Sequence, residues 1–128
     1  MESLNMEVIL PVSPKELFNA WLDSKKHSQF TGSGAEIDPQ VGGSFTAWDG
    51  YISGKTLEVE PPRRILQAWR TTEFPEGSPD SQLELLFVSV PDGTRLVLNH
   101  SHIPDGQKDS YAEGWRDYYF KPMKEYFK

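Results

Sequence analysis

Two histidines separated by a single residue, His100 and His102, are the clearest candidates for metal chemistry in this sequence. On a strand both imidazole rings would face the same side, because side chains alternate between the two faces. Zinc sites use three or four protein ligands, and the chain has no cysteine and no spacing that supplies a third ligand. The pair is therefore interpreted as structural, hydrogen-bonded near a sheet edge. Neither a metal nor a cofactor is predicted.

Acid–base and nucleophilic groups give weaker patterns. Glu58 and Glu60 lie two residues apart and could form a carboxylate pair with one raised pKa. They precede Pro61-Pro62, which is typical of an exposed turn. The chain contains neither the Gly-x-Ser-x-Gly pattern of a nucleophile elbow nor the Gly-x-x-x-x-Gly-Lys pattern of a phosphate loop. No catalytic residue is predicted.

Large apolar and aromatic side chains form the third candidate group, and they recur on the predicted strands and the last predicted helix. Core packing is one interpretation of this group. If the last helix stands away from the sheet, the same residues would line a pocket of roughly 300–1,000 Å³ suited to an apolar ligand. The candidates for such a pocket are Trp69, Phe87, Leu98, His100, Trp115, Tyr119 and Met123.

The elements that must position these residues begin with a strand over residues 4–10, which ends at Pro11. The next four residues are a capping box with proline at the first helical position, Ser13-Pro14-Lys15-Glu16. Apolar pairs at four-residue spacing then indicate a helix: Leu17 with Trp21, and Phe18 with Leu22. A second short helix is predicted over residues 24–30, with Ser24 as its N-cap.

The middle of the chain predicts antiparallel strands over residues 44–48, 51–59, 64–70, 82–90 and 94–103. Asp49-Gly50 and Asp92-Gly93 are typical of two-residue hairpin turns. The second turn predicts that Phe87 lies opposite Leu98, and Leu85 opposite His100. That register places five apolar side chains on one face of the sheet: Leu83, Leu85, Phe87, Leu96 and Leu98.

A long helix is predicted over residues 108–127, with an apolar stripe at four-residue steps: Tyr111, Trp115, Tyr119 and Met123, extended by Tyr118 and Phe127. Pro122 should bend this helix near Tyr118, because proline removes one backbone hydrogen bond. The order of elements predicts an α+β fold of the helix-grip type. In such a fold a curved antiparallel sheet wraps around a long C-terminal helix, and two short helices follow the first strand.

Length and charge narrow the classes of function. The 128 residues fit one domain over residues 1–128. A net charge of −6 repels the phosphates of nucleic acid and of anionic membranes. No segment approaches the roughly 18 apolar residues of a membrane span, and the first ten residues lack the features of a signal peptide. We therefore expect a cytoplasmic protein with no nucleic-acid partner and no membrane insertion.

Several stretches together carry a resemblance to a known family. They are Ser13-Pro14-Lys15-Glu16-Leu17, Val41-Gly42-Gly43-Ser44-Phe45, Asp49-Gly50 with Ser53-Gly54, Glu60-Pro61 before Ile65 and Trp69, Phe74-Pro75-Glu76-Gly77, Gly93-Thr94, and the segment from Gly114 to Phe120. In this order and spacing they resemble the activator of heat-shock protein 90 ATPase homologue family. That family lies within the START-like (SRPBCC) helix-grip superfamily, which includes lipid-transfer proteins and birch-pollen allergens.

The resemblance implies a non-enzymatic binding module that holds a small hydrophobic ligand in a cavity between the C-terminal helix and the sheet. A first alternative is a co-chaperone-like protein that modulates the ATPase of a heat-shock protein 90 chaperone. The loop Pro75-Glu76-Gly77 and the segment Gly114-Trp115 resemble the C-terminal domain of the eukaryotic two-domain activator. The amino-terminal domain of that activator, which holds the middle segment of the chaperone, has no counterpart in this sequence, so stimulation through two sites is not expected. A second alternative is a cavity enzyme of the cyclase or hydrolase type, for which His100 or Tyr119 would be the starting point.

Overall fold

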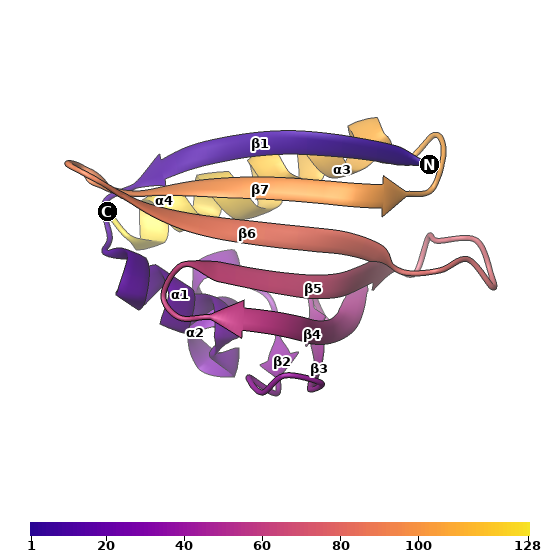
Figure 1. Cartoon of the computed structure of the whole chain (residues 1–128), viewed down its shortest axis with the longest axis horizontal. Helices are drawn as coiled ribbons and strands as arrows, with labels where there is room; N and C mark the ends of the chain where they lie inside the picture. The colour runs from indigo at the N-terminus through magenta and orange to yellow at the C-terminus, as the bar shows by residue number, and fades with distance from the viewer.

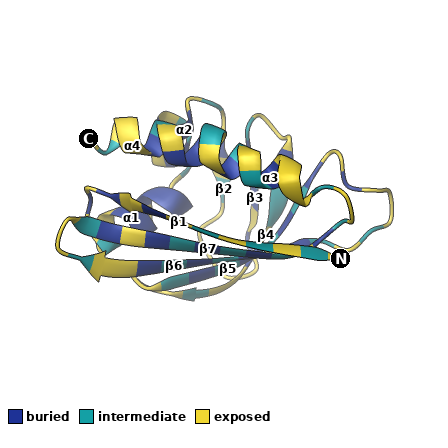
Figure 2. Ribbon diagram, turned by 90° about the horizontal axis from the view of Figure 1, so that it is seen from above, coloured by how far each residue is buried: buried dark blue, intermediate teal, exposed yellow.

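A computed structural model describes residues 1–128 as one curved antiparallel sheet with all the helices on one of its faces (Figures 1 and 2). The sheet has seven strands in the order β1-β7-β6-β5-β4-β3-β2. In chain order the elements are β1 (Glu2–Leu10), α1 (Pro14–Leu22), α2 (Ser24–Thr31), β2 (Glu36–Ile37), β3 (Ser44–Ala47), β4 (Ile52–Glu60), β5 (Arg64–Thr71), β6 (Ser81–Val90), β7 (Gly93–Ile103), α3 (Lys108–Gly114), η1 (Trp115–Phe120) and α4 (Lys121–Tyr126). This architecture confirms the predicted α+β helix-grip fold. None of the helices has the length and hydropathy needed to cross a bilayer.

The two short helices begin at side-chain caps. The Ser13 hydroxyl accepts a hydrogen bond from the Glu16 backbone N–H at 3.2 Å, which confirms the predicted start of α1. The second cap was predicted wrongly, because Asp23 precedes α2 in extended conformation and accepts from the Lys26 N–H at 2.8 Å. The Ser24 hydroxyl instead bonds both backbone groups of Ile37, so it joins α2 to β2.

The β3–β4 turn has four residues rather than two, since Ala47 pairs with Ile52. Trp48 and Asp49 adopt left-handed backbone conformations, with φ of 52° and 56°. The Asp49 carboxylate accepts hydrogen bonds from the Gly34 N–H at 2.9 Å and the Ser33 hydroxyl at 3.0 Å. These bonds offset the cost of the left-handed residues, which is of order 1 kcal/mol each. As a consequence, Trp48 leaves the strand.

The predicted register of β6 and β7 is wrong by two residues. Phe87 pairs with Leu96 and Leu85 with Leu98. The turn consists of Pro91 and Asp92, and Gly93 already belongs to β7 with φ of 135°. Only glycine fits there, because a Cβ atom would collide with the carbonyl oxygen of Leu10. A two-residue shift leaves every side chain on its face, so the predicted apolar face is confirmed: Leu83, Leu85, Phe87, Leu96 and Leu98 are all buried.

The two histidines of β7 do not share a face, contrary to the prediction. Leu4 pairs with His100 and Glu2 with Ile103, so β7 carries one extra residue against β1. This bulge forms at His102, whose φ is 61°. Because the bulge interrupts the alternation, Ile103 joins His100 in the core and His102 is exposed.

The C-terminal helix is continuous from Lys108 to Tyr126, but its middle segment η1 is a π-helix. The Lys121 N–H donates to the Arg116 carbonyl five residues earlier. Pro122 supplies no N–H, so the departure from α geometry lies just before it. The wide turn buries Phe120 and leaves Tyr118 60% exposed. Tyr118 therefore does not extend the core stripe as predicted.

Two neutral histidines connect the helix layer to the rest of the core. The Trp115 indole N–H donates to Nδ1 of His100 at 3.1 Å, so the ring proton lies on Nε2, which donates to the Ser81 hydroxyl at 2.8 Å. The Tyr119 hydroxyl donates to Nε2 of His27 at 3.0 Å, and Nδ1 of His27 donates to the Trp21 carbonyl at 2.9 Å. Burial lowers the pKa of His27 to about 4 and that of His100 to about 3.

Gly54 lies at a position in the sheet that has no room for a side chain. A Cβ atom there would collide with the Ala68 carbonyl and press on the Phe45 ring, whereas a Cβ at Gly114 meets nothing within 4 Å. We expect Gly54→Ala to lower the free energy of unfolding by about 2 kcal/mol, as overpacking does. Gly114→Ala should raise it by about 0.5–1 kcal/mol through helix propensity. Urea unfolding of both variants checks this, and equal effects of the two would contradict it.

The buried histidines predict acid sensitivity. Above pH 6.5 both are neutral in folded and unfolded chains, so they add no pH dependence. Below pH 6.5 the unfolded chain binds protons that the folded core excludes until the pH reaches about 4 for His27 and about 3 for His100. Stability should fall by up to about 1.4 kcal/mol per pH unit for each histidine. Chemical unfolding between pH 7 and pH 4.5 measures this slope.

The matched variants for that experiment lie on the same strand. His100→Asn should be less stable at pH 7 but should show a shallower slope in acid, because one of the two protonation sites is gone. His102→Asn is the control, since its ring is exposed. An acid slope that is unchanged in His100→Asn would show that His100 is not the origin of the sensitivity.

Candidate functional site

A cavity of about 340 Å³ opens between the C-terminal helix, the β3–β4 turn and the adjoining ends of β4 and β5. Seven of its ten lining residues are aromatic, and none carries a charge. We call it the aromatic pocket, and it is lined by Trp48, Tyr51, Ile52, Trp69, Ser110, Tyr111, Gly114, Trp115, Tyr118 and Tyr119. Its volume lies in the range of small-molecule sites.

The pocket wall depends on the two irregular segments of the chain. The four-residue turn places Trp48 and Tyr51 outside the sheet, where they reach the helix. On the helix, Ser110, Gly114 and Tyr118 follow one another at four-residue steps and share one side. Because Gly114 has no side chain and its missing Cβ would meet no atom, it leaves the space between the two walls open.

Three of the predicted site residues, Trp69, Trp115 and Tyr119, lie in the wall of the aromatic pocket. The other four, Phe87, Leu98, His100 and Met123, lie in the packed core, and none is more than 4% exposed. Sequence reasoning missed the remaining wall residues. One signal was available for the helical part of the wall. Ser110 and Gly114, at four-residue steps before Tyr118, are small residues in a helix whose other inward-facing residues are large. A ligand-binding role for all of these residues stays a prediction.

Two pairs of aromatic rings in the pocket wall meet at steep angles. The Trp48 and Tyr118 rings lie 5.6 Å apart at 71°, and the Trp69 and Tyr111 rings lie 5.2 Å apart at 84°. Trp115 continues the wall from Trp69 at 5.5 Å. Edge-to-face pairs of this kind are a favoured packing of aromatic rings. They hold the wall in a fixed shape.

The hydroxyls of Tyr51, Tyr111 and Tyr119 are bonded to other protein groups, whereas the buried Trp48 indole N–H has no hydrogen-bond partner. The Tyr111 hydroxyl contacts the Thr71 hydroxyl at 2.7 Å and donates to Gln107 at 2.6 Å. The Tyr51 hydroxyl donates to Glu73, and burial raises the pKa of Tyr51 to about 12. Burial also raises the pKa of Tyr119. These phenols therefore stay protonated at neutral pH and offer no base for acid–base chemistry.

His100 has no free ring nitrogen, because Trp115 and Ser81 occupy both. No three His, Asp or Glu side chains come close enough to hold a metal ion. His100 thus serves the interior as a hydrogen-bonding residue, and Tyr119 is likewise bonded to His27.

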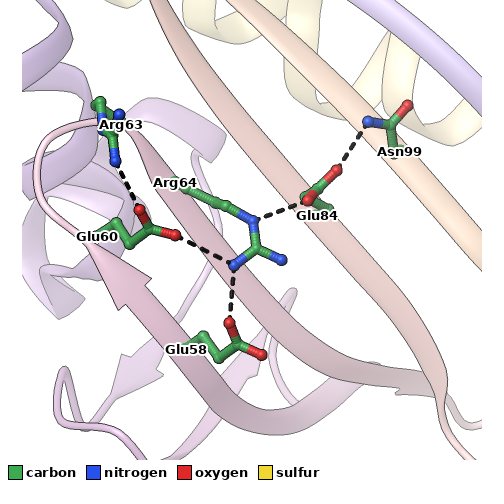
Figure 3. Close-up of polar contacts among 6 residues, drawn as sticks. All are labelled: Glu58, Glu60, Arg63, Arg64, Glu84 and Asn99. Atoms are coloured by element: carbon green, nitrogen blue, oxygen red, sulfur yellow. Dashed lines mark hydrogen bonds and ion pairs between the residues drawn. The ribbon is translucent and has the colours of Figure 1, made fainter.

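The carboxylate pair Glu58 and Glu60 lies on the outer face of the sheet, away from the helices, and contacts Arg64 (Figure 3). Arg64 also pairs with Glu84 at 2.8 Å, and Asn99 donates to Glu84 at 3.0 Å. The Arg64 guanidinium lowers the pKa of the Glu84 carboxyl. The Arg64 side chain is only 23% exposed. The cluster joins three strands by ion pairs and is not an acid–base site.

The chain is similar to known proteins along most of its length. Residues 11–128 match the family model described as Activator of Hsp90 ATPase homolog 1-like protein. The human activator of 90 kDa heat shock protein ATPase homolog 1 is 30% identical over 115 residues, which cover 90% of this chain and 34% of the human protein. The chain therefore spans about one third of the length of the curated relatives that it matches.

Solved structures show the same fold along nearly the whole chain. An HSP90 activator from Plasmodium falciparum superposes with a TM-score of 0.89 at 28% identity, covering 97% of this chain and 94% of that one. A protein from Mesorhizobium loti superposes with a TM-score of 0.79 at 20% identity, covering 97% and 95%, and shows the shared fold alone. With the family model matched from residue 11 to the last residue, the chain belongs to the Activator of Hsp90 ATPase homolog 1-like family.

Proposed function

We propose that this chain is a non-enzymatic binding module that contacts a chaperone of the heat-shock protein 90 type and modulates its ATPase. The observation that supports this proposal is the similarity along nearly the full chain to the Plasmodium falciparum HSP90 activator. The human relative, an activator of the same ATPase by its name, adds support. The absence of a free acid–base group in the aromatic pocket agrees with a role in binding. A cytoplasmic location is part of the same proposal.

The chaperone proposal predicts a saturable effect on ATP hydrolysis. Adding increasing amounts of this protein to a heat-shock protein 90 chaperone should raise the steady-state ATPase rate until the chaperone is saturated. A coupled ATPase assay measures it, with the residual rate in the presence of a chaperone-specific inhibitor subtracted. An unchanged rate at large excess, together with no binding heat in calorimetry, would reject the proposal.

The aromatic pocket favours a second function, the binding of a small apolar ligand. Its volume of about 340 Å³ and its aromatic lining are those of a site that removes most of a small molecule from water. Burying a ring-sized ligand against such walls yields roughly 25 cal/mol for each Å² of apolar surface. The two functions are compatible, because the pocket occupies only one end of the helix–sheet interface.

Gly114 gives a direct test of ligand binding. Native mass spectrometry of the freshly purified protein should show an added mass that is absent under denaturing conditions. Gly114→Leu should remove it, because the new side chain fills the open space next to the helix. Gly114→Ala is the control that keeps most of the volume. An added mass that persists in folded Gly114→Leu would place the ligand elsewhere.

A further inference from the structure

The composition of the pocket wall is more specific than apolarity requires. Aliphatic side chains would serve an uncharged hydrocarbon equally well, yet seven of the ten lining residues are Trp or Tyr. Aromatic rings differ from aliphatic groups in presenting a negative face to whatever lies above them. A ring face attracts cations, most strongly when the cation is poorly hydrated and enters a site that excludes water.

The shape of the wall suits a compact, nearly spherical group. Trp48 with Tyr118, and Trp69 with Tyr111, meet at 71° and 84°. Trp115 lies at 38° to Trp69 and at 47° to Tyr119. Ring planes that differ by these angles enclose a group from several directions, whereas parallel walls would select a flat ring. The absence of Cβ at Gly114 and the small side chain of Ser110 provide the opening.

The charges around the mouth point the same way. Asp109, Glu113 and Asp117 follow the helix at four-residue steps, each one residue before a pocket-lining position. Only Asp117 pairs with basic residues, Lys121 and Arg116. On the opposite side, Glu73 is bonded to the Tyr51 hydroxyl. Three acidic residues and one basic residue, Arg116, therefore stand next to lining positions of the helix, and this excess of negative charge, like the overall charge of −6, favours a cation.

We propose that the aromatic pocket binds an alkylated ammonium group. This inference rests on the ligand-binding function proposed above and names its chemical class. Methyl groups on nitrogen supply apolar surface for the rings, and the positive charge interacts with the ring faces and with the acidic side chains next to the lining residues. A free quaternary amine and the side chain of a trimethylated lysine carry the same group, so both are sources of the ligand.

The decisive comparison is between a cation and an uncharged analogue of the same shape. Choline and 3,3-dimethyl-1-butanol have the same shape, but only choline carries the charge. Titration followed by amide chemical shifts should show choline binding about tenfold more tightly, as expected for a desolvated cation–ring interaction. A peptide with trimethyl-lysine, compared with the same peptide carrying plain lysine, distinguishes the protein-borne source from the free amine.

Variants at the rim test the role of the rings. Tyr118 is 60% exposed, so Tyr118→Leu should fold normally and weaken choline binding several-fold, roughly the share of one ring. Tyr118→Phe keeps the ring and should restore binding. Tyr126→Leu is the matched control, since Tyr126 is 41% exposed and packs against Phe30 and Phe127 outside the pocket.

Each result decides one proposal. Equal affinity for choline and for 3,3-dimethyl-1-butanol would overturn the ammonium inference while leaving a general apolar site in place. No shift in the pocket residues with choline or with the trimethyl-lysine peptide at millimolar concentration would also overturn it. The added mass in native spectra would still decide separately whether the pocket holds any ligand.

Discussion

The position of the C-terminal helix over the sheet depends on two hydrogen bonds made to neutral imidazoles inside the core. Trp115 donates to His100 on β7, and Tyr119 donates to His27 on α2. Apolar packing alone lets a helix rotate at modest cost, whereas a buried N–H left without a partner costs about 1–3 kcal/mol. These bonds therefore fix the rotation of the helix. That rotation aims Gly114 and Tyr118 at the open space beside the β3–β4 turn.

Local patterns predicted the fold and the faces of the sheet, but they did not predict the details that depend on distant residues. The capping box at Ser13 is local, and it was confirmed. The length of the β3–β4 turn was wrong because Asp49 is bonded to Gly34, fifteen residues earlier. The β6–β7 register was wrong because Gly93 must pass close to Leu10. Both errors arise where one segment constrains another that is remote in sequence.

The residues of the candidate site also fall into those that local patterns predicted and those that they did not. Trp69, Trp115 and Tyr119 were found from periodicity, since regular elements carry them. Trp48 could not be found that way, because a left-handed turn sets its direction. Tyr118 was assigned to the core for a related reason, as a uniform α-helix would bury it. The 3.6-residue period of an α-helix does not describe the π segment, in which Tyr118 is exposed and Phe120 is buried.

That π segment is equivalent to one residue inserted into an α-helix, and an insertion of one residue turns everything beyond it by about 100°. Here the insertion is absorbed inside the helix, so Met123 still reaches the interior and the last turn still packs on α2. Evolution can thus alter the pocket by gaining or losing a single codon in the helix. The sheet and its strand pairings need not change at all.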